Sequence, residues 1–532
     1  MPLAERIAHW YRTRPDALAV WIGADRIGFR ALAERAAAVA AGLRAVPSLA
    51  VGARWGVPGH GRLLAVDVGN RLCFAELFIG GTAGDGACAV LDPAWPAGQT
   101  AEVLRRLRPD LLVADASRPG TVAAARECGV PVLVAGGPDP GGADGGRSGY
   151  AAWLAAHHGA DPERELAPGA DDSTFLIGFT SGTTGVPRGF RRARAEWRAS
   201  LPRSRAVFGV TEQDRTLAPG PLAHGLGLYA FAEALHAGSA FGTLPGFDVT
   251  AVADLLAAGQ VTRLVVVPTM LRALNRRLAE LDVRLPGVTS VVSSGAALDP
   301  DTLRRTRERL PAAHVHDYYG ASELGFVTVR HLPPGTGPGD LPDSVGTPFP
   351  GVRIEVRDTA GRPVPPGTVG TIHVRSPLAC GGYVWGDGTG FSRSGEWTTV
   401  GDHGSLDASG TLHLVGRAGG MVITGGHNVH PGEVESALRR LDGVDDAVVV
   451  GVPDGYLGTV LVAVLTGPAA TAPAPESLHR RCAAHLAHHK IPRRWYALPE
   501  WPLTPSGKIA RERVAEWVRT GDPRLVPLAG ER

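Results

Sequence analysis

The sequence predicts an α/β protein with a large N-terminal domain, built from layered α/β sheets and a small β subdomain, and a smaller α+β C-terminal domain. Three observations lead to this prediction. Helical and strand patterns alternate over the first hundred residues, several later strands are apolar and end in polar loops, and short β segments take over after about residue 345. A chain of 532 residues is also too long for a single hydrophobic core.

The alternating elements come first along the chain. Residues 29–43 form an alanine-rich amphipathic pattern that predicts a helix. Residues 63–68 are typical of a buried strand, and residues 70–78 of the helix that follows it. Three further apolar strands run into polar loops: residues 175–179, 264–267 and 290–292. Ligands of open α/β sheets bind beyond the carboxyl ends of the strands, so we expect the site in these loops.

The second half of the chain changes character. Short β segments are predicted at residues 352–356, 371–374 and 412–415. The last part mixes helices, at 431–441 and 475–488, with strands, at 447–452 and 460–465. The glycine pair Gly419-Gly420 separates the two parts, and glycine pairs are typical of breaks between periodic segments. We therefore predict domains over residues 1–416 and 421–532, joined by residues 417–420.

Composition excludes several classes of protein. The formal net charge of +2 is too small to indicate a nucleic-acid or membrane-surface partner. The five cysteines are scattered and odd in number, which argues against a disulfide framework or a zinc site. No stretch is long and apolar enough for a membrane span, and none resembles a signal peptide. We expect a cytoplasmic protein.

A loop rich in glycine and hydroxyl side chains is the strongest local signal for function. It follows the strand at 175–179 and reads Thr180-Ser181-Gly182-Thr183-Thr184-Gly185-Val186-Pro187-Arg188-Gly189. The glycines permit close approach of a ligand, and the hydroxyls and backbone N–H groups make an anion-binding concavity. No Gly-Lys-Ser/Thr follows at the Walker spacing. Its position directly after a buried strand favours phosphate binding over a simple surface turn.

This segment resembles the phosphate loop of the acyl-adenylate-forming (AMP-binding) superfamily, which includes acyl-CoA synthetases, adenylation domains of peptide synthetases and luciferases. The family pattern is Thr-Ser-Gly-Ser/Thr-Thr-Gly-x-Pro-Lys-Gly. This chain differs at one position, where Arg188 replaces lysine. The resemblance implies that residues 180–185 and Arg188 contact the phosphates of ATP, although a planar guanidinium differs in geometry from an ammonium.

Further motifs of the family occur in its order along nearly the whole chain. The segment from Asp317 through Tyr318, Tyr319, Gly320 and Ala321 to Ser322 and Glu323 is similar to the family's Tyr-Gly-x-Thr-Glu motif. The resemblance implies that Tyr319 stacks on adenine, Ser322 lies near the α-phosphate and Glu323 binds Mg²⁺. Asp317, Tyr318 and Gly320 are assigned to the same nucleotide site. A carboxylate is a hard oxygen donor that suits Mg²⁺ held jointly with phosphates.

Other positions complete the implied site. Ser294-Gly295-Ala296-Ala297 resembles the segment that lines the adenine and acyl pocket, and His224 corresponds to a residue beside the acyl carboxylate. Asp402 and Arg417 match positions that hold the ribose hydroxyls. Gly425 and Gly426 match glycines that let the pantetheine arm of coenzyme A pass. The Phe-Asp pair with which amino-acid-activating domains hold an ammonium is missing, which favours an acid without an α-amino group.

Lysine is rare in this chain, and one of the two lysines ends a recognisable segment. Only Lys490 and Lys508 occur among 54 basic residues, and Lys508 ends the segment that begins at Pro502. A lysine kept against such a bias indicates a need for a compact point charge. Lys508 resembles the lysine that the mobile smaller domain of this family delivers to the carboxylate of the acid and the phosphate of ATP. The family usually has Asp or Lys in its hinge, where this chain has Gly419.

The resemblance implies an acyl-CoA synthetase close to the fatty- or aryl-acid:CoA ligases, with ATP, Mg²⁺ and coenzyme A. A carboxylic acid reacts with ATP to give an acyl-adenylate and pyrophosphate, and the acyl group then passes to a thiol. Lys508, His224, Glu323 and Ser322 are the implied catalytic residues. The acceptor stays open between coenzyme A, a carrier-protein phosphopantetheine and an amine. A luciferase-type oxygenase, or a nucleotide-binding scaffold without catalysis, also fits the motifs. The sequence does not identify the acid.

Overall fold

The structure is a computed structural model, which describes residues 2–47, 61–136, 149–180, 186–337, 339, 344–385, 390–417, 422–424, 427–454, 458–467, 475–483 and 486–528. By contacts within the chain it divides into two compact units. Unit 1 comprises residues 1–341, 349–352 and 375–398, and unit 2 comprises residues 342–348, 353–374 and 399–532. Residues 399–416, predicted in the larger domain, are thus grouped with the C-terminal part. This grouping does not locate a hinge, and the limits 1–416, 417–420 and 421–532 stay predictions.

The first sheet of unit 1 contains the strands around the second and third predicted loops. In spatial order its strands are β14 (Gly325–Leu332), β13 (His314–Ala321), β12 (Ser290–Ser294), β11 (Arg263–Val266), β9 (Arg215–Leu217), β10 (Ala240–Thr243), β1 (Leu18–Ile22) and β2 (Asp25–Gly28). The strands from β13 to β1 run parallel, whereas β14 and β2 are antiparallel to their neighbours. The carboxyl ends of β12 and β13 therefore meet at one edge of the sheet.

The second sheet of unit 1 carries the glycine-rich loop. Its strands, in spatial order, are β6 (Val132–Ala135), β5 (Leu111–Asp115), β3 (Leu63–Asp67), β4 (Ala87–Val90), β7 (Thr174–Thr180) and β8 (Arg188–Ala193). All pairs are parallel except β7 with β8. The predicted parallel α/β arrangement is confirmed. Arg188 and Gly189, the last residues of the predicted loop, begin the strand β8, because they pair with β7 in a hairpin.

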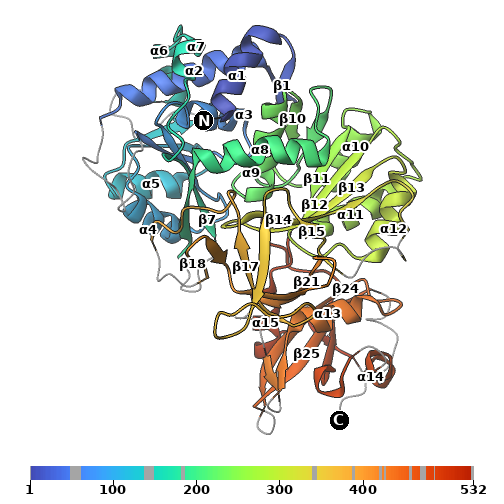
Figure 1. Cartoon of the computed structure of the whole chain (residues 1–532). Helices are drawn as coiled ribbons and strands as arrows, with labels where there is room; N and C mark the ends of the chain where they lie inside the picture. The colour runs from blue at the N-terminus through green and yellow to red at the C-terminus, as the bar shows by residue number, and fades with distance from the viewer. Residues whose placement is uncertain are drawn as a thin grey trace. The chain divides into compact units, whose positions relative to one another are not determined.

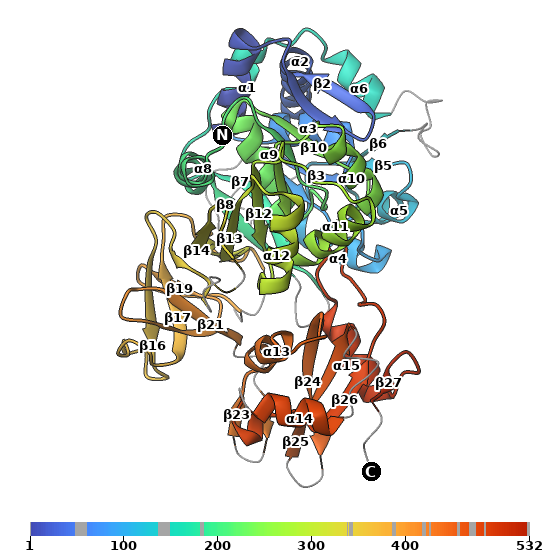
Figure 2. The ribbon, with the colours of Figure 1, turned by 90° about the vertical axis from the view of Figure 1, so that its right-hand side faces the viewer.

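Helices cover both sheets of unit 1 (Figure 1). They are α1 (Pro2–Thr13), α2 (Phe29–Ala45), α3 (Leu72–Gly81), α4 (Ala97–Leu107), α5 (Pro119–Glu127), α6 (Tyr150–Ala156), α7 (Pro162–Glu165), α8 (Arg194–Phe208), α9 (Gly225–Ala237), α10 (Val249–Ala257), α11 (Pro268–Glu280) and α12 (Pro300–Arg309). Apolar residues of α10, α11 and α12 pack on β11, β12 and β13, and Figure 2 looks onto these helices. Residues of α4 and α5 pack on β3, β4 and β5. These apolar cores anchor the strands that the predicted loops follow.

Unit 2 combines a small β subdomain with an α+β body. The subdomain contains β16 (Arg353–Arg357), β17 (Gly370–Arg375), β20 (Asp402–Leu406) and β21 (Leu412–Arg417). The body has the hairpin β22 (Val422–Thr424) and β23 (His427–Val429), and a sheet of β24 (Asp446–Asp454), β25 (Gly458–Thr466), β26 (Arg494–Ala497) and β27 (Val526–Pro527). Helices α13 (Pro431–Arg439) and α14 (Pro475–Ala483) share one core with this sheet, and α15 (Arg511–Thr520) belongs to another.

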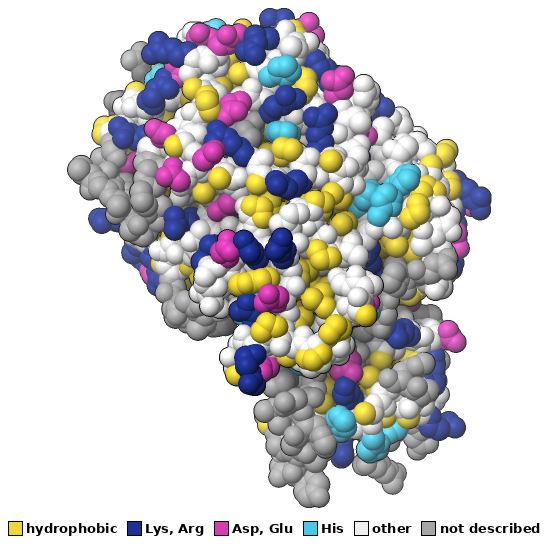
Figure 3. Space-filling model, viewed as in Figure 1, with side chains coloured by type: hydrophobic (Ala, Val, Ile, Leu, Met, Phe, Trp, Pro, Cys, Tyr) yellow, Lys and Arg dark blue, Asp and Glu magenta, His cyan; other side chains and the backbone are white. Residues whose placement is uncertain are grey.

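Most predicted elements are confirmed within a few residues, with one clear difference. The helix expected over residues 475–488 ends at Ala483, and residues 488–490 form a short 3₁₀ turn instead. Among the described residues, no helix combines the length and the apolar character that a bilayer span requires. Basic and acidic side chains are interspersed over the face in Figure 3, as expected for a net charge of +2. All five cysteines are free.

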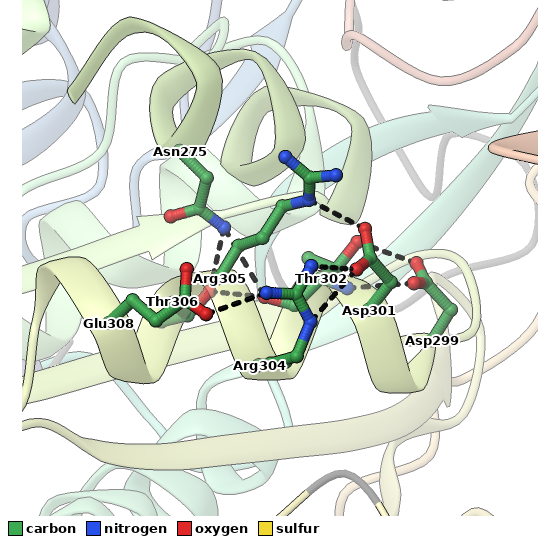
Figure 4. A network of polar contacts seen from close by, with 8 residues as sticks. All are labelled: Asn275, Asp299, Asp301, Thr302, Arg304, Arg305, Thr306 and Glu308. Carbon is green, nitrogen blue, oxygen red and sulfur yellow. Dashed lines mark hydrogen bonds and ion pairs between the residues drawn. The ribbon is translucent and has the colours of Figure 1, made fainter. Parts of the chain in front are cut away.

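Helix α12 shows how local sequence sets an element boundary next to the site. Asp299 accepts a hydrogen bond from the Thr302 N–H at 2.8 Å, and Pro300 follows at the first helical position. From α11, the buried Asn275 side chain donates to the Thr306 hydroxyl at 2.9 Å, as Figure 4 shows. The cap fixes the start of α12, just after the predicted segment 294–297, and the interhelical bond holds its second turn on α11.

We expect Asp299→Ala to lower the free energy of unfolding by about 1 kcal/mol, because the first turn of α12 loses its side-chain acceptor. Chemical denaturation of unit 1, followed by tryptophan fluorescence, measures the change. Asp299→Ser is the matched control. Serine also caps helices, so this change should lower the free energy of unfolding by only a few tenths of a kcal/mol. Equal losses in the two variants would show that the cap is not the stabilising element.

Candidate active site

The glycine-rich loop is closed by strands β7 and β8. Thr180, the last residue of β7, is paired in register with Arg188, the first residue of β8. A Cβ atom at Gly178 would lie 2.3 Å from the Phe190 ring, so only glycine allows that ring to lie flat on the strand. Ser181, Gly182, Thr183, Thr184 and Gly185 lie outside the described residues, and their contact with phosphate stays a prediction.

Thr180, Arg188, Glu323 and Tyr383 come together beside this hairpin. Glu323 follows β13 and is only 7% exposed, and the Tyr383 hydroxyl donates a hydrogen bond to its Oε1 at 2.7 Å. The guanidinium of Arg188 lies 5.8 Å from the centre of the Tyr383 ring, within range of a cation–π interaction. Burial, and then the neighbouring Glu323, raise the pKa of Tyr383 to about 12. The hydroxyl therefore keeps its proton at neutral pH and acts as a donor.

Two residues that the sequence analysis missed hold the backbone at Ser322 and Glu323. Arg192 on β8 donates to the Ser322 carbonyl at 2.6 Å and pairs with Glu196 at 3.1 Å. The Cys380 N–H donates to the Glu323 carbonyl at 2.7 Å. The Ser322 side chain is exposed, as a ligand-contacting hydroxyl requires. No local motif indicates these contacts, because they join segments far apart in the chain.

The ends of β12 and β13 are tied together side by side. The Ser294 hydroxyl donates to the Tyr318 carbonyl at 2.8 Å. Gly295 then takes a positive φ of 88°, and Gly295, Ala296 and Ala297 are exposed. Gly320 packs so closely on β14 that a Cβ there would lie 2.3 Å from the Gly325 carbonyl oxygen. Tyr319, between these two strand ends, is half-buried. The structure therefore places the predicted adenine segments at one edge of the sheet.

Asp317 and Tyr318 have partners within the fold. The Asp317 carboxylate is 5% exposed and accepts a hydrogen bond from Arg330 Nε at 3.1 Å, across the β13–β14 register. Burial raises the pKa of Asp317, and the Arg330 guanidinium opposes that rise. The Tyr318 ring packs against Phe326, with centroids 4.7 Å apart. Both side chains stabilise the strand pair, and their predicted contact with nucleotide stays untested.

His224 is held by a carboxylate from the other sheet. It precedes α9, and its Nε2 lies 3.1 Å from Oδ2 of Asp92, which follows β4. Burial opposes ionisation of Asp92, but the hydrogen bond and charge of His224 and the N–H of Ala94 bring its pKa below the usual value. The carboxylate is therefore ionised at neutral pH and orients the imidazole. Asp92 is another residue that the sequence analysis did not identify.

In unit 2, Lys508 stands on a tight turn. The Thr504 N–H donates to the Lys508 carbonyl at 2.7 Å, Gly507 has a φ of 77°, and Lys508 is exposed. Three residues later, Arg511 forms an ion pair with Glu435, which is buried in α13. The turn is thus anchored to the body of unit 2 while its lysine faces outward.

The other predicted residues of unit 2 are described only in part. Asp402 begins β20, is 6% exposed and is paired in register with Arg417 of β21. Their contact with ribose stays a prediction. Gly425, Gly426 and the hinge glycine Gly419 lie outside the described residues. The second lysine, Lys490, donates a hydrogen bond to Glu433 Oε1 at 2.6 Å. This ion pair gives Lys490 a structural role.

A cavity of about 870 Å³ lies in unit 1 beyond the carboxyl ends of β3, β5 and β6. Each of its three arginines is paired with a carboxylate: Arg35 with Glu76, Arg71 with Asp115, and Arg118 with Asp67. Because these positive charges are already matched, the cavity offers little net attraction to a polyanion such as ATP. None of the predicted site residues is among the described residues that line it.

We expect Arg330→Met to cost about 3–5 kcal/mol in the free energy of unfolding, because it leaves the Asp317 carboxylate buried without a counter-charge. The loss should be smaller at pH 5 than at pH 8. A buried carboxyl with a raised pKa binds its proton more readily in the folded state, so stability falls as the pH rises. Denaturant unfolding at several pH values measures both effects.

The double variant Asp317→Asn/Arg330→Met is the control, since it removes both charges. It should be more stable than Arg330→Met alone and show no such dependence on pH. A loss in Arg330→Met that is the same at every pH would indicate missing packing rather than a stranded charge.

Comparison with known proteins agrees with this geometry. The model of the AMP-binding enzyme family matches residues 7–384, and that of the AMP-binding enzyme C-terminal domain matches residues 433–508. The uncharacterised acyl-CoA ligase YhfT of Bacillus subtilis is 32% identical over 519 residues, which cover 96% of this chain and 98% of that protein. The fatty acid–acyl-carrier-protein ligase ScoC of Streptomyces coeruleorubidus is 31% identical, covering 69% of this chain and 71% of that protein.

Solved structures give the same result for the fold. The ATP-bound crystal structure of MatB from Rhodopseudomonas palustris is similar with a TM-score of 0.82 at 25% identity, covering 98% of this chain and 99% of that chain. The first family model spans more than half of the chain, and YhfT matches over nearly its whole length. The chain belongs to the AMP-binding enzyme family and is an AMP-forming acid–thiol ligase that uses ATP.

Proposed function

We propose that this enzyme activates a carboxylic acid without an α-amino group, in a site beyond the carboxyl ends of β7, β12 and β13. The observation that carries the proposal is the meeting of Thr180, Arg188 and Glu323 in one cluster. They come from two motifs, Thr180 and Arg188 from the glycine-rich segment and Glu323 from the segment 317–323, and together they supply a hydroxyl, a cation and a carboxylate. Phosphoryl chemistry needs such positioned groups more than it needs a general base.

The residues of the cluster fit a magnesium ion. Glu323 is a buried carboxyl group, and a neutral hydroxyl engages one of its oxygens. Such an oxygen is the donor that Mg²⁺ prefers. When bound, the ion neutralises phosphate charge and helps to orient the phosphates for in-line displacement. Arg188 is the residue proposed to contact the pyrophosphate, and Ser322 the residue proposed to lie near the α-phosphate.

Lys508 is proposed to act in the first step. The acid's carboxylate attacks the α-phosphorus of ATP, a bond forms between them, and pyrophosphate leaves with its bonding electrons. An ammonium near the carboxylate and the α-phosphate stabilises the charge that develops there. His224, oriented by Asp92, is proposed to lie beside the acid. Rotation about residues 417–420 then withdraws Lys508 and opens the acyl-adenylate to a thiol.

A carrier protein is the second candidate acceptor. The relative ScoC is named as a fatty acid–acyl-carrier-protein ligase, and a phosphopantetheine thiol has the same chemistry as that of coenzyme A. Pyrophosphate exchange over fatty, aryl and polyketide-like acids identifies the acid first. Mass spectrometry of the product formed with coenzyme A, or with a phosphopantetheinylated carrier protein, then identifies the acceptor. Absence of exchange with every acid would contradict the adenylation step itself.

Lys508→Ala should slow pyrophosphate release by about 10²-fold to 10³-fold, because the first step loses a preorganised electrostatic contact. Thioester formation from preformed acyl-adenylate should be largely spared. The matched control is Lys490→Ala, which removes the only other lysine and should leave both half-reactions near normal. Equal loss in the two half-reactions of Lys508→Ala would contradict its assignment to the first step.

Gly419→Pro should leave adenylation near normal and suppress thioester formation, because proline restricts the backbone that the rotation uses. Gly419→Ala restricts this backbone far less than proline does. Its rate of thioester formation should therefore lie between those of Gly419→Pro and the wild type. Single-turnover assays of each half-reaction measure the two effects separately. Unchanged thioester output in Gly419→Pro would refute the placement of the hinge.

A further inference from the structure

Tyr383 contributes to the site from a segment that carries no predicted site residue. It lies 60 residues after Glu323 in the sequence, yet its hydroxyl is 2.7 Å from Glu323 Oε1. A phenol has one O–H donor and two acceptor lone pairs. The donor goes to Glu323, while Thr180 and Arg188 also hydrogen-bond with the Tyr383 side chain. The hydroxyl thus links the metal-binding motif to both ends of the phosphate loop.

The rest of the residue is fixed as well. The Arg188 guanidinium faces the ring at 5.8 Å, and Tyr383 forms an isolated β-bridge with Phe190 of β8. The next residues continue this attachment: the Val384 N–H donates to the Gly189 carbonyl at 2.7 Å, and the Trp385 indole donates to the Pro187 carbonyl at 3.0 Å. These contacts attach the segment 383–385 to β8 and to Pro187 just before it, and so they fix the position of Tyr383.

We propose that Tyr383 is a positioning residue that orients the Glu323 carboxylate for the magnesium ion of the nucleotide. This inference rests on the proposed role of Glu323. A neutral donor on Oε1 fixes the rotation of the carboxylate and leaves Oε2 for the cation. An arginine or lysine in the same place would neutralise the carboxylate and compete with the ion. The phenol therefore orders the ligand without reducing its charge.

Tyr383→Phe tests this role, because phenylalanine keeps the ring that Arg188 faces and removes only the hydroxyl. Outer partners of a metal ligand typically change metal affinity about 10-fold to 100-fold. We expect Tyr383→Phe to weaken Mn²⁺ binding in the presence of ATP by about tenfold, measured from the free Mn²⁺ signal in electron paramagnetic resonance. In pyrophosphate exchange, the Mg²⁺ concentration for half-maximal rate should rise, and the rate at saturating Mg²⁺ should largely recover.

Tyr11→Phe is the matched control. It removes a hydroxyl from helix α1, away from the cluster, and should bind Mn²⁺ like the wild type. Unchanged Mn²⁺ affinity in Tyr383→Phe would overturn the inference. A fall in exchange rate that excess Mg²⁺ does not recover would overturn it too, since that points to general structural damage.

Glu323→Gln separates this inference from the proposed function. If Glu323→Gln weakens Mn²⁺ binding and Tyr383→Phe does not, only the role of Tyr383 fails. If Glu323→Gln leaves Mn²⁺ binding unchanged, the assignment of Glu323 as metal ligand fails, and the inference about Tyr383 fails with it.

Discussion

The free energy of burying carboxylates at the ends of parallel strands is the constraint on which this site depends. A carboxylate removed from water needs hydrogen-bond donors or a counter-charge, or it gives up its ionisation. Three of them, Glu323, Asp317 and Asp92, lie within or just after strands of unit 1, and each is paired with a residue from another segment. The partners are Tyr383, Arg330 and His224.

The chemical nature of each partner decides what its carboxylate can do. Arg330 matches the charge of Asp317 fully, which makes the pair a brace between β13 and β14. Tyr383 donates a neutral hydroxyl to Glu323 and thereby holds one oxygen of that side chain in place. Asp92 has the reverse role, because its negative charge orients the His224 imidazole. Similar carboxylates in one unit are thereby separated into a structural brace, a proposed metal ligand and an orienting group.

The preference of this chain for arginine also has a physical reading. Arginine forms forked, fixed contacts to carbonyls and carboxylates, as Arg192 does behind Ser322. Arg188 extends that choice into the glycine-rich loop, where its planar group faces the Tyr383 ring as well as carrying charge. Lysine is retained where an ion pair uses it, at Lys490, and on the exposed turn that presents Lys508. A flexible stem with a compact charge suits the role proposed for Lys508, which is to enter the site and leave it again.

The sequence alone determined the α/β class, the parallel strands, the order of the motifs and the strand ends at which they lie. These follow from local signals: apolar periodicity, glycine and proline positions, and motif spacing. The predicted helix that begins at Pro475 was too long. That Arg188 begins a strand was not predicted either, because its pairing with β7 decides this. Tyr383, Arg192 and Asp92 became visible only in the tertiary structure. Their contacts join residues 60 and 130 positions apart, or residues of two different sheets. Tertiary packing decides which of these residues meet, and the spacing of residues in the sequence does not predict it.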